Sequence, residues 1–211
     1  GKSTLFRTLL GLLPAQGGEV RIGGDPLGSL SRAAVAKRVS YVPQAHAGYF
    51  PFTVRDVALM GRTAHLSPFA APSRHDADVA DACLARLGLA DLADHVYTRI
   101  SGGERQLVLI ARALAQEAPL VVMDEPTASL DFGNQVRVLA EVRSLAASGI
   151  GVMMATHDPD QAFLCADRVA LLHGGRLVAD APPREAITPE TLREVYGVDA
   201  AVVDVPLPDG G

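Results

Sequence analysis

The sequence predicts an α/β fold in which helices cover both faces of a mostly parallel sheet. Residues 120–123 (LVVM) form an unbroken apolar run, short enough for a strand that is buried on both faces. A helical pattern over residues 134–147 follows, and a second apolar strand at 150–155 completes a βαβ unit. Because a helix joins the two strands, we expect them to be parallel neighbours.

Length and composition indicate an ordinary globular protein. The chain has 211 residues, which suits one domain or one domain with a subdomain. Its 48% hydrophobic and 20% charged content is typical of globular domains, and no apolar run is long enough to cross a bilayer. The net charge of −5 gives no electrostatic footprint for nucleic acid, so we expect no nucleic-acid partner. Any membrane association is expected to run through a partner protein.

The chain begins Gly1-Lys2-Ser3-Thr4, which matches the end of a phosphate-binding loop, G-x-x-x-x-G-K-[ST]. In such a loop Gly1 lets the backbone approach the phosphates and Lys2 reaches the β- and γ-phosphates. The Ser3 hydroxyl ligates Mg²⁺, and Thr4 is placed to hydrogen-bond a phosphate oxygen. Four residues alone do not exclude an ordinary lysine at a helix start. The first part of the loop is absent, so we expect the sequence to be a fragment.

The elements that follow can be placed in order. An amphipathic helix is expected over residues 5–13, stopped by Pro14. Short strands are expected within 17–24, antiparallel, and at 38–43. Thr53 and Ser73 are predicted helix caps. Later in the chain we expect a hairpin at 168–180 and a last helix from 189 to 197.

Ser101-Gly102-Gly103-Glu104 opens a further helical pattern, with Leu107, Ile110, Ala111 and Leu114 expected on one face. Ser101 and Glu104 fit a capping box, which would be a purely structural role. The two glycines favour a second interpretation. Glycines are useful where backbone N–H groups approach an anion closely at a helix N-terminus.

Two carboxylates, Asp124 and Glu125, follow the buried strand, and Pro126 ends the strand ladder. Ligands of open α/β sheets lie beyond the carboxyl ends of the strands. Side chains alternate along a strand, so the two carboxylates point to different sides. One of them can hold a metal ion while the other faces a water molecule. His157 follows the next strand and should reach the same sheet edge.

Together, ISGGERQ (100–106) and LVVMDEP (120–126) resemble the signature and Walker B motifs of the ATP-binding cassette (ABC) ATPases. YVPQ at 41–44 resembles the Q-loop of this family, Ser129-Leu130-Asp131 its D-loop, and His157 the histidine of its H-loop. The motifs stand in family order and cover essentially the whole chain. The resemblance implies a P-loop NTPase-type α/β fold with an antiparallel β subdomain and an inserted helical subdomain.

The resemblance also implies roles for individual residues, with ATP and Mg²⁺ as cofactors. Glu125 would polarise the attacking water, His157 would hold the γ-phosphate, and Gln44 would contact the metal or the water. The implied metal ligands are Ser3, Gln44 and Asp124. The implied ATP-binding residues are Gly1, Lys2, Ser3, Thr4, Ser101, Gly102, Gly103, Glu104 and Asp131.

The domain organisation follows from the same resemblance. It implies a single nucleotide-binding domain over residues 1–211, whose N-terminal part is missing. A helical subdomain is inserted at 50–100, and a C-terminal helix and tail occupy 181–211. Three phenylalanines of the helical subdomain have two possible roles, as core residues or as the lining of a groove for a partner helix: Phe50, Phe52 and Phe69.

The function implied is that of the ATP-hydrolysing subunit of an ABC importer, working as a pair of copies, with a homodimer as the expected form. A membrane permease would contact the helical subdomain, and a solute-binding protein would take part indirectly, which places the protein at the cytoplasmic face of the inner membrane. FPFTVRDVALMGR (50–62) and ITPETLREVYGVDA (187–200) are similar to importers of iron–siderophore, haem or cobalamin. A molybdate or tungstate importer and a non-transport ABC ATPase are the alternatives. A DNA-repair member would carry a coiled coil or zinc hook, which this sequence lacks.

Overall fold

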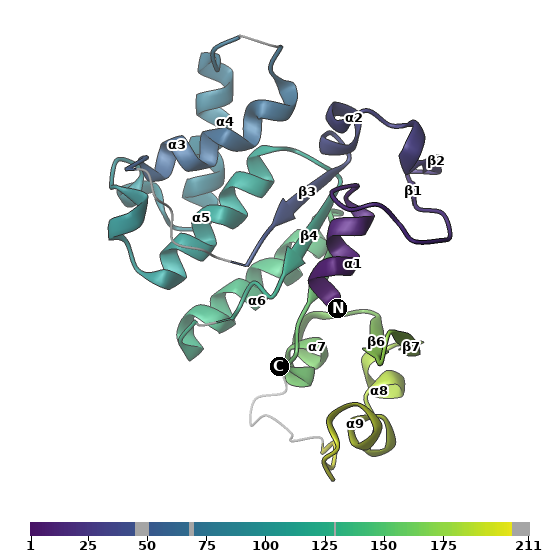
Figure 1. Ribbon diagram of the computed structural model, residues 1–211. Helices are drawn as coiled ribbons and strands as arrows, with labels where there is room; N and C mark the ends of the chain where they lie inside the picture. The colour runs from purple at the N-terminus through teal and green to yellow at the C-terminus, as the bar shows by residue number, and fades with distance from the viewer. Residues whose placement is uncertain (45–50, 68–69, 129, 204–211) are drawn as a thin grey trace. The chain divides into compact units, whose positions relative to one another are not determined.

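The computed structural model describes residues 1–44, 51–67, 70–128 and 130–203. The chain forms two compact units, Gly1–His157 and Asp158–Gly211. Figure 1 shows the first unit as a sheet with helices around it and the second as a small group of helices and strands. Of the three phenylalanines with two possible roles, Phe50 and Phe69 lie outside the described residues, and Phe52 is exposed.

The predicted parallel sheet is present in the first unit. Strands β3 (Val39–Val42), β4 (Leu120–Asp124) and β5 (Gly151–Ala155) pair in parallel, in the order β3-β4-β5. In the register, Val42 pairs with Met123, and Asp124 pairs with Ala155. The central strand is buried along most of its length, as its apolar sequence requires. All three strands therefore end at one edge of the sheet.

Helices pack on this sheet. Phe6 of α1 (Lys2–Leu9) forms a buried cluster with Val39, Val122 and Ala155. Val121 and Met123 alternate with Val122 and so face the other side of the sheet. Helix α5 (Gly102–Ala115) contacts β3, and α6 (Phe132–Ala147) contacts β5 (Figure 1). The strands are thus sandwiched between helices.

Helix α1 both begins and ends earlier in the chain than its apolar pattern predicts, since it starts at Lys2 and not at Leu5. It ends at Leu9, with Leu10 as its C-cap, instead of continuing to Leu13. The reason is Gly11, which has a φ of +71°, a left-handed conformation that interrupts an α-helix and that glycine adopts without steric cost. Leu12 and Leu13, beyond this break, are among the exposed hydrophobic side chains.

Helix α5 is buried more completely than the predicted single apolar face. All residues from Leu107 to Ala111 are buried. The physical reason is that α5 has neighbours on several sides, because β3, α6 and the helices α3 (Val54–Leu59) and α4 (Arg74–Arg86) all contact it. A helical stretch that is apolar all round, as residues 107–111 are, is typical of such a central position.

Between Thr53 and Arg99 the described chain is helical, with one isolated bridge between Thr53 and Val96. Thr53 and Ser73 cap α3 and α4, each in a capping box with an aspartate three residues later. The remaining short elements of the first unit are the strands β1 (Arg21–Ile22) and β2 (Asp25–Pro26), which pair antiparallel as expected, α2 (Arg32–Ala36), and the 3₁₀ helices Leu27–Ser29, Met60–His65, Ala90–Leu92 and Tyr97–Arg99.

The second unit contains the predicted hairpin, in which β6 (Val169–His173) pairs antiparallel with β7 (Arg176–Ala181). The predicted last helix, α9 (Pro189–Tyr196), starts at the Thr188 cap and ends at Gly197. Helices α7 (Pro159–Cys165) and α8 (Pro183–Ala186) complete the unit, whose buried core is Ala162, Ala186, Ile187 and Leu192. Within the described residues, no helix is sufficiently long and apolar to span a membrane.

Candidate functional site

The candidate site lies where β4 and β5 end. Glu125 follows Asp124 directly and has a φ of +49°, which is unusual for a residue with a side chain. Its backbone N–H donates to the Ala155 carbonyl at 3.0 Å, so the chain stays attached to β5 while it turns away from the sheet. Such strained backbone often accompanies functional sites, because surrounding structure must hold it in place.

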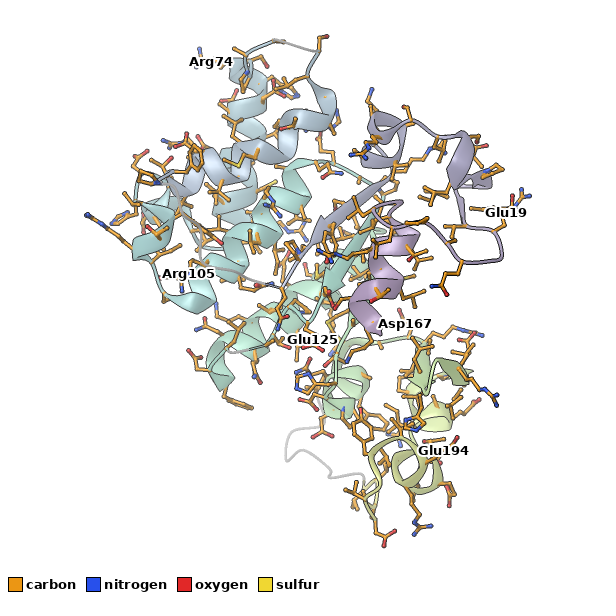
Figure 2. The ribbon with its side chains drawn as sticks, viewed as in Figure 1. Glu19, Arg74, Arg105, Glu125, Asp167 and Glu194 are labelled. Carbon is orange, nitrogen blue, oxygen red and sulfur yellow. The ribbon has the colours of Figure 1, made fainter. Side chains whose placement is uncertain are left out.

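The Glu125 carboxylate joins two of the other predicted residues. Its Oε1 lies 3.2 Å from the Lys2 ammonium, and its Oε2 lies 3.4 Å from Nδ1 of His157. Lys2 also donates a hydrogen bond of 2.7 Å to the Thr156 carbonyl. Figure 2 shows the labelled Glu125 at the start of α1. Three residues that are far apart in sequence therefore meet at one point.

Electrostatics favour the ionised form of Glu125. Partial burial would raise the pKa of this carboxyl group. The hydrogen bond and positive charge of Lys2, followed by the contribution of His157, outweigh burial and bring the pKa below its usual value. Glu125 is therefore a carboxylate at neutral pH, as a proton acceptor must be.

Asp124 is buried and occupies the other side of the strand end. Its Oδ2 accepts a long hydrogen bond of 3.4 Å from the Tyr41 hydroxyl on β3, while Oδ1 has no hydrogen-bond partner among the described residues. A buried carboxylate oxygen without a partner is costly unless a ligand satisfies it. An oxygen donor of this kind suits Mg²⁺, which is commonly bound by one or two carboxylates and waters.

Tyr41 is not among the site residues that the sequence predicts. Burial is the main cause that raises the pKa of its hydroxyl group, and the negative charge of Asp124 raises it further. A polar residue near the end of a neighbouring parallel strand was the available signal. Tyr41 pairs with Val122, two residues before Asp124.

The remaining predicted residues of this edge are exposed. Gly1 is the N-cap of α1, and Ser3 and Thr4 lie on the first turn of that helix beside Lys2. Gln44 stands two residues beyond Val42, just as Glu125 stands two residues beyond Met123, the partner of Val42. Both therefore leave the sheet at the same edge.

The Ser101 turn lies at the start of α5. The Ser101 hydroxyl accepts from the Glu104 N–H at 3.2 Å, and the Glu104 carboxylate accepts from the Ser101 N–H at 2.7 Å. The interaction of the Glu104 carboxylate with the Ser101 side chain, followed by the hydrogen bond from the Ser101 backbone N–H, lowers the pKa of Glu104. The predicted capping box is therefore present in the structure. Ser101 and Gly102 are nevertheless exposed and accessible to a ligand.

Asp131 caps α6 in a similar way. Its carboxylate accepts hydrogen bonds from the backbone and side-chain N–H groups of Asn134, at 2.9 and 2.7 Å. The backbone hydrogen bond and then the side-chain one lower the pKa of Asp131. Ser129, which belongs to the same predicted motif, lies outside the described residues.

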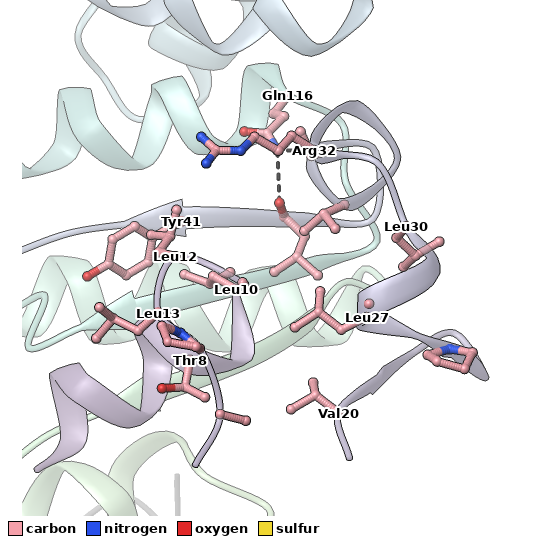
Figure 3. Close-up of a pocket in the computed structure, with 18 of the residues that line it drawn as sticks. Thr8, Leu10, Leu12, Leu13, Val20, Leu27, Leu30, Arg32, Tyr41 and Gln116 are labelled. Carbon is pink, nitrogen blue, oxygen red and sulfur yellow. Dashed lines mark hydrogen bonds between the residues drawn. The ribbon is translucent and has the colours of Figure 1, made fainter. Parts of the chain in front are cut away.

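A separate hollow of about 1090 Å³ lies between the end of α1, β3 and the short elements around α2 (Figure 3). Leucines form much of its wall, and the Tyr41 ring lies at its border. The Gln116 side chain donates to the Val39 carbonyl at 2.9 Å beside it. None of the predicted site residues lines this hollow.

Comparison with known proteins identifies the family. The site places the chain among the α/β nucleotide-binding proteins, whose ligands lie beyond the carboxyl ends of parallel strands. The model of the ABC transporter family matches residues 1–128. The chain belongs to the ABC transporter family, and the prediction of an ATPase subunit of a transporter is confirmed at that level.

Three relatives illustrate the likeness. An uncharacterised ABC transporter ATP-binding protein of Haemophilus influenzae is 44% identical, over 93% of this chain and 74% of its own length. The cobalamin import ATP-binding protein of Halobacterium salinarum is 43% identical over 99% of this chain, which spans only 54% of that protein. The hemin import ATP-binding protein of Nocardia farcinica is 41% identical, over 98% of this chain and 71% of its length.

Solved structures give the same result. A metal-chelate type ABC transporter in an inward-facing conformation superposes with a TM-score of 0.83 at 36% identity, covering 94% of this chain and 74% of that one. The ADP conformation of an ATP-binding cassette superposes with a TM-score of 0.81 at 24% identity, covering 93% and 83%, a likeness of fold alone. The predicted fold class is confirmed.

Proposed function

We propose that this protein hydrolyses ATP to drive an importer that carries an iron complex, such as a siderophore or haem, or cobalamin. The observation that supports the chemistry most strongly is the meeting of Lys2, Glu125 and His157 at the carboxyl edge of the sheet. The cargo is supported by the relatives, which include import proteins for hemin and for cobalamin.

The three side chains suggest how binding and hydrolysis are linked. The Glu125 carboxylate is held by the Lys2 ammonium and lies beside His157. A γ-phosphate carries more negative charge than a single carboxylate, and its oxygens can accept hydrogen bonds from the Lys2 ammonium and from a ring N–H of His157. ATP would draw Lys2 and His157 away, and Glu125 would then be free to accept a proton from the water that attacks the γ-phosphorus. The products are ADP and inorganic phosphate.

The residues present also fit Mg²⁺. Asp124 would hold the ion directly or through water with its unpartnered Oδ1, and Ser3 and Gln44 are the further ligands that we propose. When bound, Mg²⁺ neutralises charge that develops on the phosphate oxygens. Tyr41 keeps the second Asp124 oxygen engaged, so that the carboxylate presents Oδ1.

The working unit is proposed to be two copies of the chain. Ser101, Gly102, Gly103 and Asp131 of one copy would meet the ATP held by Lys2 and Glu125 of the other. The exposure of Ser101, Gly102 and Asp131 supports this arrangement. The helical region at 50–100 would contact a membrane permease, and the protein would work at the cytoplasmic face of the inner membrane through that contact.

Replacement of Glu125 by Gln tests the catalytic role. Phosphate release should fall by a factor on the order of 10²–10⁴, the usual contribution of a general base, while ATP binding persists because Lys2 and Asp124 are unchanged. Phosphate release and binding of a fluorescent ATP analogue are to be measured on the full-length protein. Glu141→Gln is the matched control, because Glu141 pairs with Arg86 outside the site. Turnover near that of the wild type in Glu125→Gln would remove Glu125 from the proposed role.

A further inference from the structure

The N-termini of α5 and α6 approach each other closely. A Cβ atom at position 103 would lie 2.4 Å from Nδ2, 2.5 Å from Cγ and 2.9 Å from Oδ1 of Asn134. Real side chains do not come this close, so Gly103 is needed here for packing. A Cβ atom at position 102 would have open space around it, because the nearest atom, Nη2 of Arg105, would lie 4.0 Å away. Packing therefore requires glycine at position 103 but does not require it at position 102.

The same Asn134 amide is occupied on its other side. Its Nδ2 donates to Oδ2 of Asp131 at 2.7 Å, and its backbone N–H donates to Oδ1 at 2.9 Å. The neighbouring Gln135 side chain donates to the Leu130 carbonyl at 3.1 Å. The turn before α6 is thus held by two consecutive side chains, and one of them also packs on Gly103.

We propose that Asn134 is a positioning residue that ties the Ser101–Glu104 turn and the Asp131 turn of one chain into a single unit. This inference rests on the proposed function, in which both turns face the ATP of the second copy. If the Ser101–Glu104 turn shifts toward Asn134, the Asn134 side-chain amide has to rotate. This rotation separates Nδ2 of Asn134 from the Asp131 carboxylate. The two turns therefore reach the second copy in a fixed mutual position.

Three variants of the full-length protein test this coupling of the two turns. Asn134→Ala removes the hydrogen bond to Asp131 Oδ2 and leaves Gly103 uncrowded. Gly103→Ala keeps Asn134 but forces its amide to move. The double variant removes the crowding without restoring the hydrogen bond. Gly133→Ala is the matched control, because its Cβ would meet only Asp131 Oδ1, at 3.5 Å, an ordinary contact.

We expect Asn134→Ala to bind a fluorescent ATP analogue like the wild type and to lose roughly 10- to 100-fold in turnover, the range that small misplacements of catalytic groups produce. Gly103→Ala should lose both thermal stability and turnover. The double variant should regain the stability that Gly103→Ala loses, but not the turnover. Recovery of both together, or unchanged turnover in Asn134→Ala, would overturn the proposal.

A measurement without ATP keeps this test independent of the proposed function. In the presence of Asn134, the effects of Gly103→Ala and Asp131→Ala on the free energy of unfolding should be non-additive. In the Asn134→Ala background they should add. Additivity in both backgrounds would show that Asn134 carries no coupling. Absence of ATP turnover in the wild type would instead contradict the proposed function.

Discussion

At the scale of single residues, Tyr41 has the least obvious position. It sits on β3, in a different part of the sequence from the carboxylates, and contacts Asp124 across the parallel ladder. Residues that orient a metal ligand can matter nearly as much as the ligand itself. In the proposed Mg²⁺ site, replacement of Tyr41 would therefore disturb the orientation of Asp124 while the proposed ligands themselves stay unchanged.

Tyr41→Phe should raise the Mg²⁺ concentration needed for half-maximal ATP turnover by about tenfold, the lower end of the effect of losing an outer-shell partner. The hydroxyl is lost, and the Asp124 carboxylate is no longer oriented by it. Turnover is to be measured against Mg²⁺ at saturating ATP. Tyr97→Phe, at a buried tyrosine of the helical region, is the control. Identical Mg²⁺ dependence in the two variants would contradict this role for Tyr41.

Much of the site could be predicted from the sequence because its residues lie next to chain features with local signals. Asp124 and Glu125 end an apolar strand, Lys2 starts a helix, and His157 follows the next strand. Tyr41 had only a weak signal, its place near the end of a neighbouring strand, because its partner Asp124 is remote in sequence. The contact of Asn134 with Gly103 joins two helices and has no local signal. The need for glycine at position 103 likewise comes from its contact with α6, which a local sequence pattern does not show.

At the scale of elements, local signals predicted the capping residues of helices better than where the helices end. Capping boxes at Thr53, Ser73 and Ser101 are present in the structure. The end of α1 at Leu9 was not predicted, because an apolar pattern does not reveal where a glycine leaves the helix. The all-round burial of α5 depends on how many elements surround it, which is a property of the whole first unit.

The cap of α4 also gives a pH-dependent stability. Asp76 accepts hydrogen bonds from Ser73 and from the buried Arg62, whose guanidinium also donates to the Ala115 carbonyl. The hydrogen bonds from Ser73, followed by that from Arg62, hold the Asp76 pKa well below its usual value. A depressed pKa in the folded state gives stability above the unfolded-state pKa, which is lost as pH falls toward the folded one.

Asp76→Asn should therefore destabilise the protein at pH 7 and progressively less below about pH 4, the usual aspartate pKa. The free energy of unfolding is to be measured by urea denaturation from pH 7 down to pH 3. Asp78→Asn, on an exposed position of the same helix, is the control. A constant difference between Asp76→Asn and the wild type across this range would show that Asp76 is not the titrating cap.

At the scale of the whole molecule, the proposed ATP site requires two copies of the chain. One chain places Lys2 and Glu125 together, but its Ser101 turn stands at the start of a different helix, capped and exposed. The capping box alone explains Ser101 as a structural residue. The proposal that Ser101 also meets the ATP of the second copy is the central claim, and a capping role and an ATP-contacting role predict different outcomes for one residue.

The most direct test compares Ser101→Arg with Ser101→Ala in the Glu125→Gln background, where hydrolysis is suppressed. Both variants lose the cap and should lose about 1 kcal/mol of stability. Arginine also adds bulk and charge to the exposed turn. ATP-dependent dimerisation of the full-length protein is to be measured by light scattering, with binding of a fluorescent ATP analogue to the monomer as the control. We expect that both variants bind ATP, that Ser101→Ala still dimerises at least in part, and that Ser101→Arg remains monomeric. Equal ATP-dependent dimerisation of the two variants would contradict the claim that this turn completes the ATP site of a second copy.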